Sequence, residues 1–110
     1  MTNTKKKYNK FTGNIKTDDN VAKLMNSIES VIGVNYELLS SKSRVQLLMY
    51  ARFIFIFILK NNSKYTWKEI ASYLNRTHAT VFRAYSEAEN LMIIRNFKKQ
   101  YDSVYEKYKK

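Results

Sequence analysis

The chain has 110 residues, of which 20 are Lys or Arg and 9 are Asp or Glu, so its formal net charge is +11. This excess predicts an anionic partner, above all nucleic acid, and a hydrophobic content of 45% favours a globular domain over disorder. The absence of cysteine excludes disulfides and thiolate metal sites, and two glycines without any proline favour long helices over a β architecture.

Residues 1–17 are expected to form a basic N-terminal arm without helical or strand periodicity. Lys5, Lys6 and Lys7 precede the first acidic residue, Asp18. Two interpretations stay open: a solvated tail, or an arm that lies along phosphates or enters a minor groove. No apolar stretch follows the basic residues, so we predict no secretory signal and a location in the bacterial cytoplasm, associated with the nucleoid.

Residues 18–110 are expected to form one all-α domain of about five to six helices, with a central hydrophobic helix and a helix-turn-helix. Apolar residues at helical spacing predict a first helix over 19–32, which Gly33 ends. A short helical turn over 36–39 should follow, capped by Asn35.

The central helix is predicted over 44–60. Its segment FIFIFIL (53–59) is rich in strand-forming residues, but the amphipathic stretch before it and the lack of a partner strand favour a helix. The apolar run 45–59 falls short of the roughly 20 residues that span a bilayer, so we interpret it as a buried helix of a soluble domain. Arg52 interrupts this run and either reaches the surface or serves as a cation at the edge of the core.

A helix-turn-helix is predicted over 66–88. Thr66 and Glu69 match a capping box at the start of its first helix. Asn75 stands at the tight turn, where a residue that tolerates the left-handed conformation is needed, and Thr77 can cap the second helix. Trp67 is expected to cover the edge of the core beside Phe53 or Phe55 rather than to stack on a base.

The first residues of the second helix of such a motif meet base edges. The residues predicted to contact bases are Arg76, Thr77, His78, Ala79, Thr80 and Arg83. Arg can donate bidentately to guanine, and Thr or Ala can touch a thymine methyl. For His78, a capping or surface role is the alternative. The residues predicted to contact phosphates or a minor groove are Lys5, Lys6, Lys7, Lys42, Arg44, Tyr65, Thr66 and Lys68.

A last helix should begin after a break near Asn96. Its aromatic residues at helical spacing are Phe97, Tyr101, Tyr105 and Tyr108. They either pack on the core or form an exposed surface for an acidic protein partner, such as a replication, polymerase or virion component.

The sequence offers no catalytic constellation. His78 is the single histidine, and the chain has no phosphate-binding GxxxxGK[ST] loop and no GxSxG motif. The carboxylate pairs, such as Asp102 with Glu106, suit a solvated surface. We therefore predict no enzymatic activity, no metal, no cofactor, no small-molecule substrate and no membrane association.

Several motifs resemble the C-terminal DNA-binding domain of the bacterial replication initiator DnaA, a Trp-repressor-like helical fold. The resemblance covers about residues 21–105 and rests on GVNYELLSSKSR, KEIASYL and RTHATVFRAY. It implies that Arg76 to Val81 match the family signature Arg-Asp-His-Thr-Thr-Val. It also implies that Arg52 corresponds to an arginine that enters the minor groove.

Thr77 and Ala79 depart from that signature, which implies a different target sequence. The resemblance implies a stand-alone, initiator-like protein without the ATPase module, encoded by a phage or mobile element. The leading hypothesis is a sequence-preferring double-stranded DNA-binding protein that acts in transcription or replication control. The alternative is a module that uses the same fold to bind an acidic protein.

Overall fold

The computed structural model describes residues 18–62 and 65–110. The regular secondary structure of these residues is all helical, which confirms the all-α expectation. Its helices are α2 (Asp19–Ile32), α3 (Tyr36–Leu39), α4 (Gln46–Asn62), α5 (Trp67–Leu74), α6 (His78–Leu91) and α7 (Arg95–Tyr108). The predicted arm, with Lys5, Lys6 and Lys7, lies outside the described residues.

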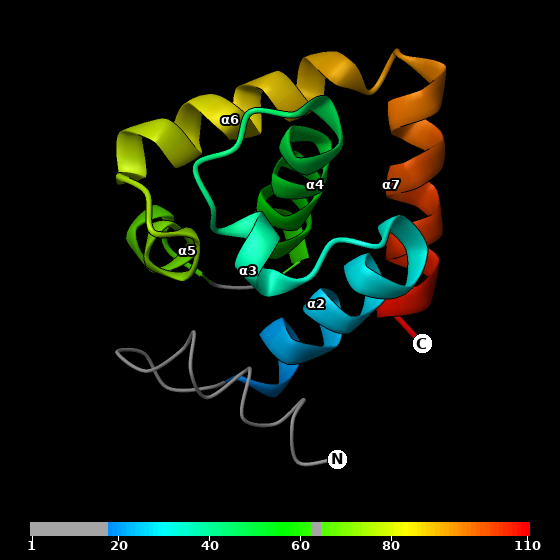
Figure 1. Ribbon diagram of the computed structural model, residues 1–110, viewed down its shortest axis with the longest axis horizontal. Coiled ribbons are helices and arrows are strands. Elements are labelled where there is room, and N and C mark those ends of the chain that lie inside the picture. Colours follow the sequence, from blue (N-terminus) through cyan, green and yellow to red (C-terminus); the bar gives the residue numbers. More distant parts are fainter. Residues whose placement is uncertain (1–17, 63–64) are drawn as a thin grey trace.

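Helix α4 is the centre of the domain. It contacts each of the other five described helices, which surround it in Figure 1. The strand-like segment 53–59 is helical because these neighbours leave few of its sides to solvent: Ile54, Phe55, Ile58 and Leu59 are fully buried. Over residues 18–62 and 65–110, no helix combines the length and apolarity needed to cross a membrane.

The predicted helices over 19–32 and 36–39 are confirmed to the residue, and Gly33 ends the first of them in the left-handed conformation with φ of 84°. Helix α4 instead begins and ends two residues later than predicted. Its start is delayed because Ser43 belongs to the preceding loop, where its hydroxyl accepts from the Val45 amide at 3.3 Å.

Helices α2 and α7 pack against each other and against α4. Phe97 and Val104 of α7 are fully buried, and the Tyr108 hydroxyl bonds the Asn20 side chain at 2.7 Å. Tyr101 and Tyr105 are half-buried and stack on each other with 5.9 Å between ring centroids. The aromatic residues of α7 therefore pack on the core, and the structure does not support the alternative that all four form an exposed partner surface.

The break before α7 lies at residues 92–94, slightly ahead of the predicted position. Ile94 is extended there, and its amide bonds the Leu91 carbonyl at 2.8 Å. The change of direction visible between α6 and α7 in Figure 1 lets Phe97 reach Tyr50 of α4, with ring centroids 5.1 Å apart. Packing of α7 thus fixes a break that carries no glycine or proline.

Candidate nucleic-acid interface

Helices α5 and α6 are joined by a three-residue turn, 75–77. Asn75 has φ of 58° and ψ of 46°, so it adopts the left-handed conformation that the sequence predicts. The Arg76 amide then bonds the Ala71 carbonyl at 3.0 Å, which satisfies an acceptor at the end of α5. Ala71 and Ile70 are buried where the two helices meet. The helix-turn-helix prediction is confirmed in its geometry.

Both helices of the motif have capped N-termini. In α5, the Thr66 hydroxyl accepts from the Glu69 amide at 3.1 Å, while the Glu69 carboxylate accepts from the Thr66 amide at 2.8 Å. In α6, the Thr77 hydroxyl accepts from the Thr80 amide at 3.2 Å. The Thr77 and Thr80 hydroxyls also lie 3.0 Å apart. The Thr77 cap stabilises the start of α6, the segment predicted to meet bases.

One face of α6 is open to solvent. Val81 and Ala88 point into the core, whereas His78, Ala79 and Arg83 are exposed. Phe82 belongs to the same outward face and is 55% exposed. Sequence reasoning missed Phe82, although its position one turn after His78 puts it among the predicted readers.

Trp67 of α5 packs against aromatic side chains of α6. Its ring packs edge-to-face on Phe82 and Tyr85, with centroids 5.2 Å and 5.3 Å away. The Lys60 ammonium lies 4.4 Å from the Trp67 ring centroid, a cation–π geometry. The predicted structural role of Trp67 is thus confirmed, but the predicted partners were wrong: its aromatic neighbours come from α6 instead of α4.

Arg76 is turned into the protein. Its Nη1 donates to the carbonyls of Leu74 at 2.8 Å and Ser40 at 3.2 Å, and its Nη2 donates to Ser41 at 2.5 Å. Both terminal nitrogens needed for a bidentate guanine contact are therefore already used. Base reading by Arg76 stays a prediction that would require some of these bonds to open.

Arg52 is buried, with 8% of its surface exposed. Its guanidinium donates to the carbonyls of Leu39 at 2.6 Å, Ser43 at 2.7 Å and Ser41 at 2.8 Å. Burial, and then the nearby charge of Arg76, lower the pKa of Arg52 from its ordinary value. Minor-groove entry by Arg52 stays a prediction, and it would require this buried cation to leave its partners.

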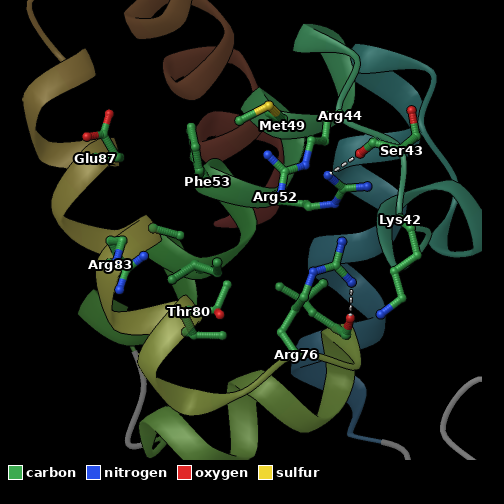
Figure 2. Close-up of a pocket in the computed structure, with 14 residues that line it drawn as sticks. Lys42, Ser43, Arg44, Met49, Arg52, Phe53, Arg76, Thr80, Arg83 and Glu87 are labelled. Atoms are coloured by element: carbon green, nitrogen blue, oxygen red, sulfur yellow. Dashed lines mark hydrogen bonds between the residues drawn. The ribbon is translucent and has the colours of Figure 1, made fainter.

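A cleft of about 480 Å³ lies between the α3–α4 loop and α6. Figure 2 shows Arg52 and Arg76 pointing toward the loop that carries Lys42 and Ser43, with Arg83 on α6 on the opposite side of the view. The basic residues that line it are Lys42, Arg44, Arg52, Arg76 and Arg83, against a single acidic residue, Glu87. Such a lining gives the cleft a positive potential.

The predicted phosphate contacts fall into two groups. The side chains of Lys42, Arg44 and Lys68 are exposed, and within residues 18–62 and 65–110 none of these side chains makes a hydrogen bond or ion pair. Thr66 is engaged in its capping box, and the Tyr65 hydroxyl bonds the Asp18 carboxylate. Burial and this bond raise the pKa of Tyr65. The first group is free to meet an anion.

Comparison with known proteins supports this geometry. The model of the bacterial DnaA protein helix-turn-helix family matches residues 21–87. The chromosomal replication initiator protein DnaA of Kosmotoga olearia is 32% identical over 78% of this chain and 19% of its own length. DnaA of Pseudothermotoga lettingae is 35% identical over 63% of this chain and 16% of its own length.

A third relative, DnaA of Flavobacterium psychrophilum, is 29% identical over 89% of this chain and 21% of its own length. The chain thus spans about a fifth of the length of the curated relatives that it matches.

Proposed function

The chain belongs to the bacterial DnaA helix-turn-helix family, and from this premise we propose that it binds double-stranded DNA with a sequence preference. Helix α6 enters the major groove, which is wide enough to admit an α-helix. The observation that carries the proposal is the open N-terminal face of α6, which presents His78, Phe82 and Arg83 beside a basic cleft.

The exposed side chains of α6 suit base edges. Arg83 can donate to guanine, His78 to a base acceptor, and Ala79 can touch a thymine methyl. Phe82 joins them as an apolar contact for a thymine methyl, because the ring is exposed and fixed by Trp67. Thr77 and Thr80 form the cap and are assigned to the rim of this contact.

Phosphate contacts flank the reading face. Lys42 and Arg44 lie on one side of the cleft, and Lys68 lies in the first turn of α5. The segment 1–17 joins the domain at Asp18, whose carboxylate is bonded to Tyr65 just ahead of α5. An arm that starts at this point, with Lys5, Lys6 and Lys7, is suited to follow the same DNA duplex.

The biological role assigned here is control of replication or transcription by occupancy of a DNA site, without catalysis. The names of the relatives favour replication initiation. The features used in binding are groove contacts and charge, and neither requires a chemical step.

Random-site selection on the purified chain, followed by binding measurements across a salt series, tests this function. We expect a defined motif and an affinity that falls steeply with salt. In a plot of the logarithm of the binding constant against the logarithm of the salt concentration, each neutralised phosphate contributes a slope of roughly −0.9. Half-site symmetry in the motif would report dimerisation. Binding that ignores both sequence and salt would contradict the proposal.

A further inference from the structure

The loop between α3 and α4 is held by two arginines from different parts of the chain. Arg52 comes from the first half of α4, and Arg76 comes from the turn before α6. Their guanidiniums share one acceptor, the Ser41 carbonyl, at 2.8 Å and 2.5 Å. Figure 2 shows the two side chains converging on this loop. The loop is thus tied both to the central helix and to the helix-turn-helix.

The loop divides its polar backbone between two kinds of partner. Serine hydroxyls bond its amides. The Ser41 hydroxyl accepts from the Ser43 amide, and the Ser43 hydroxyl accepts from the Val45 amide, both at 3.3 Å. The two arginines donate hydrogen bonds to its carbonyls, which have no partner in regular secondary structure. A guanidinium suits this task because its planar fork donates in several directions at once, which a lysine ammonium on a flexible stem does not do.

The charge of this pair is unbalanced. Among the described residues, no carboxylate forms an ion pair with either guanidinium, and both are near enough for Arg76 to disfavour the charge on Arg52. Two like charges held together cost free energy unless other contacts compensate. The carbonyls compensate here, so the positive charge of the pair adds to the field of the cleft.

We propose that Arg52 and Arg76 are positioning residues, which hold the loop beside α6 so that Lys42 and Arg44 meet the DNA backbone while α6 reads bases. This inference rests on the proposed DNA-binding function and adds a division of labour to it. The two carbonyl-bonded arginines fix the geometry, and exposed cations on the fixed loop make the contacts. Figure 2 supports this division, since Lys42 extends from the loop beside Arg76.

A double-mutant cycle on the full 110-residue chain tests the proposal. The variants are Arg52→Lys, the pair Lys42→Ala with Arg44→Ala, and all three changes together. The probes are a duplex with the selected motif and a shuffled duplex, each measured across a salt series. In the otherwise unchanged chain, the loop pair should lower the salt slope by about 2, because two phosphate contacts are lost.

In the Arg52→Lys background, the same pair should change the slope by less than about 0.5, since a displaced loop no longer brings these cations to phosphates. The affinity ratio between the two duplexes should stay within about twofold, because α6 still carries its readers. A merely structural loss of stability would change neither the slope nor its coupling to Lys42 and Arg44.

Ile28→Val is the matched control, because Ile28 is fully buried in α2, outside the loop and α6, and its truncation lowers stability. It should leave the salt slope unchanged at a temperature well below unfolding. If Arg52→Lys does not fold, the same cycle is run with Arg76→Lys, whose side chain is only half-buried.

Additive effects of the loop pair and the arginine change would overturn the positioning role. So would a loss of sequence preference with the salt slope intact, which would identify Arg52 as a direct reader. Failure of the proposed function itself looks different: the unchanged chain would then show neither a motif nor a salt slope.

Discussion

The arginines of this domain behave differently in two neighbouring regions. Arg52 and Arg76 lie behind the α3–α4 loop, and their guanidiniums donate to backbone carbonyls. Arg83 on α6 and Arg44 on the loop are exposed and make no such bonds within the described residues. The same residue type therefore builds the interface in one region and is available to a ligand in the other. Hydrogen-bond partners, more than residue type, separate the two roles.

The largest expected effect is a difference in stability between variants of the two regions. Arg52→Met should lower the free energy of unfolding by about 2–4 kcal/mol, because several loop carbonyls lose their donors together. Arg83→Met is the matched change on the exposed face and should stay within about 0.5 kcal/mol. Thermal or urea unfolding of both variants measures the difference. Equal losses would remove the distinction between building and binding arginines.

For sequence preference, in contrast to stability, the exposed residues of α6 should have the larger effect. Arg83→Ala and His78→Ala should each reduce discrimination between the selected and a shuffled duplex by about 1–3 kcal/mol, since a direct base contact is lost. Lys68→Ala, at an exposed position on α5, is the control and should weaken both duplexes alike. Competition binding at constant salt measures the ratio. If Lys68→Ala changed the preference and the α6 variants did not, the assignment of the reading face would be reversed.

The turn between the two regions should show a smaller effect. Asn75→Ala should cost about 1 kcal/mol, because alanine is strained at a φ of 58°, whereas Asn75→Gly should be neutral or slightly stabilising. Chemical denaturation of the two variants compares them directly. Equal stability of the alanine and glycine variants would contradict a conformational requirement at this turn.

The smallest effect is expected far from both regions. Lys98 and Asp102 form an exposed ion pair at 2.9 Å on α7. Asp102→Asn should change stability by less than about 0.5 kcal/mol, since exposed pairs of this kind contribute little. It should also leave sequence preference unchanged. A large loss of DNA affinity in this variant would extend the interface to α7 and weaken the comparison drawn above.

Local patterns in the sequence identified the caps and the turn. Thr66 with Glu69, Thr77 and Asn75 take the roles that their spacing predicts, because these bonds form within a few residues. The ends of α4 lie two residues later than predicted, and the break before α7 lies two to four residues ahead of Asn96. The start of α4 depends on the Ser43–Val45 bond in the loop ahead of it, and the break before α7 depends on long-range packing of Phe97 against Tyr50.

The site was predictable in outline only. Helical spacing put His78, Ala79 and Arg83 on the exposed face of α6, and they are exposed. Phe82 was missed because an aromatic side chain is ordinarily assigned to the core, and only its contact with Trp67 shows how it is held at the surface. Two of the three carbonyl partners of Arg76, those of Ser40 and Ser41, lie 36 and 35 residues away in the chain, beyond any local pattern.

The sequence by itself determined the all-α class, the helix-turn-helix and the family, because these follow from periodicity, capping and a short signature. Tertiary structure alone decided which cations are available. Arg52 and Arg83 are the same residue type. The fold surrounds Arg52 with backbone carbonyls and leaves Arg83 exposed to solvent. A guanidinium can take either role, and the acceptors within its reach fix the choice only once distant segments meet.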